Sequence, residues 1–196
     1  MKKFLTFLTF LTIILSSVGK VHSIEADIFV QSTVNRASEA LNDKFSKEEK
    51  IEKLKEIASE TVDIKGIGFY TLGAYRKSIS DDQIKQYETL FKQYFLKSFA
   101  SRLAEYSNPE IEVVSKKKLN ENYTMVSSIL VSTEKRPEVK INWRIYTKNS
   151  ENPLIRDLII EGLSLARTQK EEFSSIIQSN DGDINALFAT LKEFVK

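Results

Sequence analysis

The sequence predicts an α+β domain in which helices pack around a curved antiparallel sheet of about four strands. Apolar residues recur at helical spacing over the first half of the chain and again near its end. Between residues 111 and 163 the spacing changes to that of strands separated by polar turns. Helices and strands that are segregated along a chain, rather than alternating one by one, are typical of the α+β class.

The first residues have the pattern of a secretory signal peptide. Two lysines precede the apolar segment 4–15, and small residues follow it. This segment is shorter than the roughly 20 residues that cross a bilayer. We expect cleavage after Ser23, with Ala26 as the second choice. Residues 1–23 would then be a signal peptide and residues 24–196 a single exported domain.

The composition argues against most metal sites and most nucleophilic enzymes. The chain has no cysteine, and its one histidine, His22, lies in the predicted signal peptide. Thiolate and imidazole are the usual ligands of zinc, copper and most iron. Most nucleophilic enzymes also depend on a His or a Cys. We therefore expect neither a metal nor a cofactor, and carboxylates are the common catalytic groups that remain.

The charge of the chain argues against nucleic acid as a partner. The 29 Lys and Arg include three lysines of the predicted leader, so the exported domain would carry 26 of them against 27 Asp and Glu, a net charge of −1. Domains that bind nucleic acid usually keep a strongly basic face.

Three helical segments are expected before the longest helix. The first covers residues 26–42, where apolar residues fall on one face. The second begins at Ser46, and Glu49 stands three residues later, which is the pattern of a capping box. Residues 63–76 form a shorter helical stretch that three glycines loosen.

The longest helix is expected over residues 79–106, with Ser80 and Gln83 as its capping box. Its wide apolar stripe consists of Ile84, Tyr87, Leu90, Phe91, Tyr94, Phe95, Phe99 and Leu103. Such a stripe is usually part of a solid core. Facing apolar strands, it can also line an elongated apolar pocket, and periodicity does not distinguish the two.

Strands and two closing helices are expected in the rest of the chain. The strands cover residues 111–118, 123–132, 139–146 and 154–163. The third of these alternates between apolar and polar residues, which is typical of a strand with one face buried. The closing helices are expected over residues 165–178 and 183–195.

The polar residues do not form an evident catalytic site. Asp157 and Glu161 lie four residues apart on the expected fourth strand, so they would share one face. Paired carboxylates can act as acid and base, but no polar cluster surrounds them in the sequence. Pairing with Arg144 or Arg156 is the favoured alternative. The glycines of GIGFYTLG lack the spacing of a dinucleotide-binding loop, which favours close packing of a bent helix against the sheet, or a hinge beside a cavity.

Four segments occur in the order found in one known family. They are FYTLGAYRKSISDDQ, FASRLAEY, RPEVKINWRIY and DLIIEGLSLARTQKEEFSSII. Together they resemble the MlaC family, also called toluene-tolerance auxiliary proteins, and the resemblance covers residues 29–189. Two departures stand out: NSENPLIRD lacks the usual Gly-x-Trp turn, and Thr168, Gln169 and Lys170 stand where the family usually has Asn-Tyr-Arg.

The resemblance implies a periplasmic phospholipid carrier without enzymatic activity. Such a carrier shuttles lipid between an inner-membrane ABC-type lipid transport complex and an outer-membrane lipoprotein complex, and so maintains the lipid asymmetry of the outer membrane. We would expect a monomer whose only bound molecule is the phospholipid cargo. The family fold implies an apolar cavity between sheet and helices that holds acyl chains, with the headgroup outside.

The resemblance also guides the choice of lipid-binding residues, which are apolar residues expected to face inward. They are Phe69, Tyr70, Leu72, Tyr75, Phe91, Phe95, Phe99, Ile129, Val131, Ile141, Trp143, Ile145, Leu163 and Phe173. In the family fold, the last strand would bend at Gly162 into the helix that walls the cavity. Glu161 would point away from the lipid, and Ser164 would be the N-cap of that helix.

Two other functions remain as alternatives. A periplasmic adaptor of the same fold would bind protein partners without carrying lipid, and its interior would be solid. An enzyme that uses Asp157 or Glu161 would need a pocket in which polar groups converge.

Overall fold

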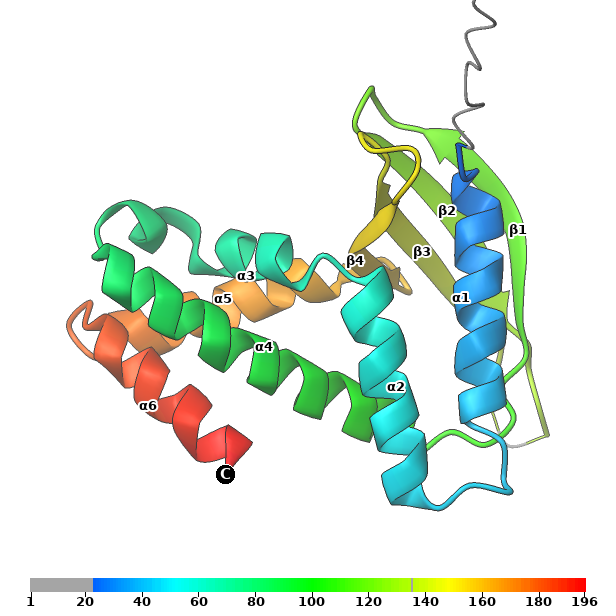
Figure 1. Cartoon of the computed structure of the whole chain (residues 1–196), viewed down its shortest axis with the longest axis horizontal. Helices are drawn as coiled ribbons and strands as arrows, with labels where there is room; N and C mark the ends of the chain where they lie inside the picture. Colours follow the sequence, from blue (N-terminus) through cyan, green and yellow to red (C-terminus); the bar gives the residue numbers. More distant parts are fainter. Residues whose placement is uncertain (1–22, 135) are drawn as a thin grey trace, which may run out of the picture.

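The computed structural model describes residues 23–134 and 136–196 (Figure 1). The predicted signal peptide therefore lies outside the described residues, apart from Ser23. In the described part of the chain, six α-helices, one 3₁₀ helix and an antiparallel sheet of five strands form an α+β fold. The predicted fold class is confirmed, and the sheet has one short strand more than the sequence indicated.

The helices before the sheet begin and end close to their predicted limits. They are α1 (Ala26–Ala40), α2 (Lys47–Thr61), α3 (Ile64–Leu72), the 3₁₀ helix η1 (Gly73–Lys77) and α4 (Asp81–Leu103). None of the helices in this described part is both long and apolar enough to cross a membrane.

Both predicted capping boxes are confirmed. Ser46 Oγ accepts a hydrogen bond from the backbone N–H of Glu49 at 3.2 Å, and the Glu49 carboxylate accepts one from the Ser46 N–H at 2.8 Å. Ser80 and Gln83 repeat this arrangement at the start of α4, at 3.2 and 3.0 Å. Each box satisfies two backbone N–H groups that have no partner within the helix, which sets where the helix starts.

The glycine-containing segment packs closely against α4 and then changes direction. A Cβ at Gly68 would lie 2.8 Å from the ring of Phe91, so a larger residue would push α3 away from α4. Gly73 has φ +58°, a conformation that disfavours residues with a side chain. The α-helix ends there and η1 follows. The segment is closely packed as expected, but at Gly68 the packing is against α4 and not against the sheet.

The sheet follows the chain order, with each strand antiparallel to its neighbour. Its strands are β1 (Ile111–Lys118), β2 (Tyr123–Leu130), β3 (Val139–Tyr146), β4 (Leu154–Ile160) and β5 (Leu163–Ser164). The predicted alternation in β3 is confirmed, since Ile141, Trp143 and Ile145 are buried. The register shifts within the β1–β2 and β3–β4 pairs, and such irregularities bend strands and increase their twist.

A two-residue turn and a short extra strand, rather than the expected bend of one strand at Gly162, lead from the sheet into the next helix. Glu161 and Gly162 both have positive φ, +48° and +85°, as a type I′ hairpin turn requires. The chain thus reverses, and β5 pairs with the end of β4 through Ile160 and Leu163. Ser164 then caps α5 (Leu165–Gln178) by accepting from the N–H of Arg167 at 3.1 Å, which confirms the predicted N-cap.

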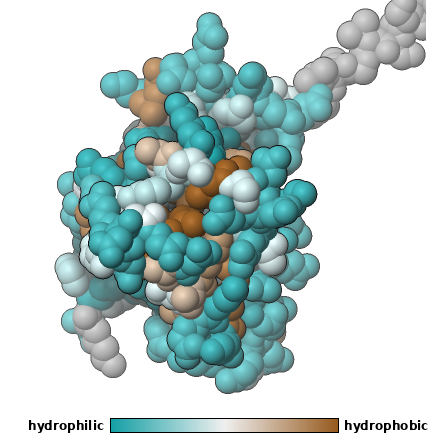
Figure 2. All heavy atoms as spheres, turned by 90° about the vertical axis from the view of Figure 1, so that its left-hand side faces the viewer, coloured by the Kyte–Doolittle hydropathy of each residue, from teal (hydrophilic) through white to brown (hydrophobic). Residues whose placement is uncertain are grey.

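The helices form two groups around the sheet (Figure 1). Helix α1 runs along the face of the sheet over β1 and β2, and α2 lies beside it. The final helix, α6 (Ile184–Val195), packs with α3, α4 and α5 in a group that extends away from the sheet. Seen from the far end of that group, hydrophilic side chains surround a narrow band of apolar ones (Figure 2). The apolar faces of these helices therefore point mainly inward.

An aromatic cluster joins α4 to α5 and α6. Tyr87 and Phe91 of α4 stack at 5.6 Å between ring centroids. Phe173 of α5 meets both rings edge-on at 6.4 and 6.2 Å, and Phe188 of α6 lies 6.4 Å from Tyr87. The Tyr87 hydroxyl lies 2.7 Å from that of Thr71 in α3. Burial raises the pKa of Tyr87, so this hydroxyl stays protonated and can donate.

Replacement of Phe173 by alanine should test how strongly the cluster holds the helical group together. We expect the free energy of unfolding to fall by about 3–5 kcal/mol, because the variant leaves a cavity beside the rings of Tyr87, Phe91 and Tyr94. Phe194→Ala is the matched control, because Phe194 is 43% exposed. This substitution should lower the free energy of unfolding by less than about 1.5 kcal/mol. Urea titration followed by circular dichroism measures both values. Equal costs for the two variants would contradict the role assigned to the cluster.

Candidate functional site

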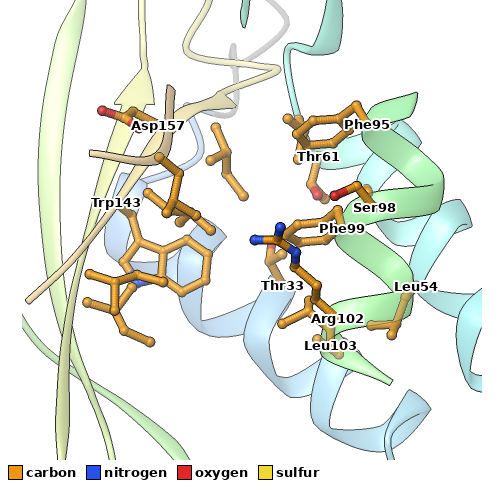
Figure 3. Close-up of a pocket in the computed structure, with 18 of the residues that line it drawn as sticks. Thr33, Leu54, Thr61, Phe95, Ser98, Phe99, Arg102, Leu103, Trp143 and Asp157 are labelled. Atoms are coloured by element: carbon orange, nitrogen blue, oxygen red, sulfur yellow. The ribbon is translucent and has the colours of Figure 1, made fainter. Parts of the chain in front are cut away.

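An apolar cavity of about 320 Å³ lies between the sheet and the helices. Its walls come from β3, β4, α1, α2, the C-terminal half of α4 and the first turns of α5. Figure 3 shows Trp143 on the sheet side, facing Phe95 and Phe99 of α4 across the space. Thr33, Leu54 and Thr61 line it from α1 and α2.

The space exists because α4 does not lie on the sheet. Helix α4 packs mainly against α2, α3 and α6. Its C-terminal half therefore crosses opposite β3 and β4, and the side chains between them leave the cavity open (Figure 3). The rings of Phe95 and Phe99, four residues apart on α4, are 5.5 Å apart and nearly parallel at 9°. This stacked pair gives the α4 wall a continuous apolar surface.

Three polar side chains in the walls are bonded to the protein itself, which keeps their part of the cavity surface apolar. The Trp143 indole N–H donates to Ser128 Oγ at 2.8 Å, within the sheet. The hydroxyls of Thr33 and Thr61 donate to the carbonyls of Phe29 and Ile57 in their own helices, at 2.8 and 2.7 Å. Groups bonded in this way do not require water or a polar ligand.

The cavity wall contains a buried carboxylate, Asp157, and both of its oxygens accept hydrogen bonds from other residues of the protein. Asp157 is 3% exposed. Its Oδ2 accepts from the Ser164 hydroxyl at 2.7 Å, and its Oδ1 accepts from the Ala166 N–H at 3.0 Å. Arg144 lies 3.8 Å away, which is one of the two pairings expected from the sequence. Asp157 thus ties β4 to the start of α5.

Glu161 does not accompany Asp157 on a common strand face. It lies in the turn after β4, and its carboxylate accepts from the backbone N–H of Lys140 at 2.5 Å. The expectation of a shared face was wrong because the strand ends at Ile160. The other arginine, Arg156, pairs with Asp63, the N-cap residue of α3, and so joins the sheet to the helical group.

One end of the cavity lies where α5 approaches α4. Gln169 and Thr168, which stand at one of the two departures from the family pattern, line it there. The Tyr94 hydroxyl donates to Gln169 Oε1 at 2.9 Å. Burial and the nearby Glu172 raise the pKa of Tyr94, so the phenol remains a donor. The third residue of that departure, Lys170, instead lies over the ring of Tyr70.

The structure brings part of the expected lipid-binding set together. The residues of that set that line the cavity are Phe91, Phe95, Phe99, Ile141 and Trp143. Those buried outside its lining are Leu72, Ile145 and Phe173. Partly buried residues away from the lining are Phe69, Tyr75, Ile129 and Val131. Tyr70 and Leu163 are exposed, at 46% and 54%.

Several lining residues were not singled out in the sequence. Val34, Leu54 and Ile57 lie on the apolar faces of α1 and α2, which the helical spacing did reveal. That spacing does not tell which stretch of an apolar face meets a cavity. Arg102, in the last turn of α4, also lines the cavity. A charged residue at a helix end usually marks a solvated position, so no sequence signal distinguished it.

Comparisons with known proteins agree with this arrangement. A family model described as MlaC protein matches residues 31–193. Among solved structures, the phospholipid-binding protein from Ralstonia solanacearum, in complex with a phospholipid, is similar with a TM-score of 0.73. The match covers 88% of this chain and 97% of that chain at 19% sequence identity, which shows a shared fold.

Asp157→Ala should destabilise the protein because it removes the link between β4 and α5. The Ser164 hydroxyl and the Ala166 N–H would lose their acceptor, and we expect the free energy of unfolding to fall by about 2–4 kcal/mol. Glu172→Gln, at an exposed position of the same cavity rim, should change it by less than about 0.5 kcal/mol. Chemical denaturation measures both. An unchanged midpoint for Asp157→Ala would refute the structural role.

Proposed function

The chain belongs to the MlaC family, and on this premise we propose that it carries phospholipid between two membranes. In this proposal the protein is exported to the periplasm by its signal peptide and exchanges lipid with an outer-membrane lipoprotein complex and an inner-membrane ABC-type transport complex. It acts as a monomer and catalyses no reaction. The observation that carries the proposal is the apolar cavity between α4 and the sheet.

The physical problem that such a carrier solves is the exposure of acyl chains to water. A two-chain phospholipid has about thirty methylenes, and each costs ~0.8 kcal/mol when it leaves an apolar environment, which amounts to more than about 20 kcal/mol. Unassisted crossing of an aqueous compartment is therefore negligible. A cavity with apolar walls removes most of this barrier, because the chains exchange one apolar environment for another.

The chemistry of the walls suits acyl chains. The stacked Phe95 and Phe99 rings oppose Trp143, whose one polar atom is directed into the sheet. The hydroxyls of Thr33 and Thr61 bond within their own helices. A ligand in contact with these walls needs no hydrogen bonds to them, which suits a chain of methylenes and disfavours a polar substrate.

The volume indicates that loading widens the cavity. At about 320 Å³ it lies at the lower end of the ~300–1,000 Å³ range of sites for drug-sized ligands. A phospholipid with two chains is larger than such ligands. Helix α4 packs mainly on other helices, so its C-terminal half can separate from the sheet without disrupting the aromatic cluster.

The adaptor alternative requires a solid interior, and the cavity argues against it. The enzyme alternative requires converging polar groups, whereas Asp157 is engaged by Ser164 and Ala166. Support for the carrier also comes from the Ralstonia solanacearum protein of the same fold, which is described as phospholipid-binding.

Native mass spectrometry tests the proposal directly. The protein, exported through its own signal peptide in a bacterium with two membranes and purified without detergent, should carry a mass increment equal to one phospholipid. Organic denaturation should release that lipid for identification. A protein that shows only its own mass and takes up no lipid from vesicles would refute the carrier function and return attention to the adaptor.

A carboxylate placed in the cavity wall should lower lipid retention. For Phe99→Glu we expect copurifying lipid to fall roughly tenfold or more, because acyl chains would contact a desolvated charge. Ile28→Glu, on the exposed side of α1, introduces the same charge away from the cavity and should leave retention unchanged. Circular dichroism checks that both variants fold. Equal retention by the two variants would exclude the α4 wall as the lipid site.

A further inference from the structure

Arg102 places a cation inside the mouth of an otherwise apolar cavity. It belongs to the last turn of α4 and is one of the lining residues. Figure 3 shows its guanidinium directed into the cavity, beside the ring of Phe99 and toward the side of Trp143. Arg102 as a whole is exposed to solvent, as a helix-end arginine usually is, so the feature that calls for an explanation is the direction of its guanidinium toward the cavity.

The acidic residues that line the cavity, and the acidic residue nearest to Arg102 in the chain, already have other partners. The other charged lining residues are Asp157, held by Ser164 and Ala166, and Glu172, which accepts from Gln169 at 2.8 Å. Glu105, the nearest acidic residue along the chain, pairs with Lys47. Within residues 23–134 and 136–196, no ion pair or hydrogen bond engages the Arg102 guanidinium. It is thus the cation of the lining that is free to bind an anion.

A guanidinium beside an apolar cavity matches the chemistry of a phospholipid. The planar fork of an arginine binds the oxygens of a phosphate with two parallel hydrogen bonds, which a lysine does not reproduce. In a phospholipid, the phosphodiester is joined through glycerol to the acyl chains. Chains that lie between Phe99 and Trp143 would therefore place the phosphodiester at the mouth, close to Arg102.

We propose that Arg102 binds the phosphodiester of the cargo and thereby selects phospholipids over neutral lipids with the same acyl chains. This inference rests on the carrier function proposed above and adds a specificity-determining residue to it. The contact also sets the orientation of the lipid, with its headgroup at the C-terminal end of α4 and its chains toward the sheet. Recognition depends on the phosphodiester, so headgroups beyond it should matter little.

A competing explanation assigns Arg102 to the stability of α4. A cation in the last turn interacts favourably with the helix dipole, whatever the cavity holds. That role predicts a less stable protein that binds every lipid proportionally less. A change in the preference between lipid classes is the result that only direct contact with the phosphodiester explains.

Competitive loading followed by native mass spectrometry separates these explanations. The delipidated full-length mature protein is offered equal amounts of phosphatidylglycerol, phosphatidylethanolamine and diacylglycerol with identical acyl chains. We expect the wild type to prefer both phospholipids to diacylglycerol. In Arg102→Gln this preference should fall roughly tenfold, the loss expected for a hydrogen bond to a charged group. Arg102→Lys should restore it in part, and Lys92→Gln, on the exposed side of α4, should keep it unchanged.

The outcomes distinguish this inference from the carrier function. If Arg102→Gln binds lipid and keeps the wild-type preference, or binds all three lipids proportionally less, the phosphodiester contact is refuted while the carrier function stands. If the wild type takes up none of the three lipids, the carrier function itself fails, and the inference fails with it. A preference for phosphatidylglycerol alone would show that net headgroup charge, rather than the phosphodiester, is recognised, which also overturns the inference.

Discussion

The packing of Tyr87, Phe91, Phe173 and Phe188 is the interaction on which the rest of the structure depends. These rings fix the N-terminal half of α4 to α5 and α6, and the opposite end of α4 packs on α2. A helix held at both ends by other helices does not need the sheet for support. The part of its C-terminal half that carries Phe95 and Phe99 can therefore stand opposite β3 and β4 with a cavity between them, which a helix packed directly on a sheet would close.

Buried polar contacts hold the two walls of this cavity in place from its margins. Asp157 joins β4 to the start of α5, and the Arg156 pair with Asp63 joins the same strand to α3. Both contacts belong to β4, so this strand links the sheet to the helical group. Because the restraints lie at the edges, the rings of Phe95 and Phe99 face the cavity without polar contacts, and the Trp143 indole N–H is bonded within the sheet. The same arrangement lets the walls separate when a larger apolar ligand enters.

For the proposed carrier, the apolar walls of the cavity would be enough for one small domain to carry lipid without catalysing a reaction. Acyl chains need only an apolar surface, which Phe95, Phe99 and Trp143 provide, and release must remain easy because the chains are to be passed on. A slot with little polar interaction binds chains about as well as a bilayer does. A single cation at its mouth would add selectivity for phosphate-bearing lipids, and one solvent-accessible contact at that position would not prevent release.

The α+β class, the approximate positions of the helices and most strands, and both capping boxes could be predicted from the residues alone, and the family resemblance added the N-cap of α5. These features depend on periodicity and on residues within a few positions of each other, such as Ser46 and Glu49. The tertiary structure alone decided which aromatic residues of one stripe enter the cluster, as Tyr87 does, and which face the cavity, as Phe99 does. It also decided that the Arg102 guanidinium points toward the cavity, although the residue as a whole is exposed. Each of these depends on contacts between segments far apart in the chain, and the spacing of residues within one segment holds no information on what the segment will meet.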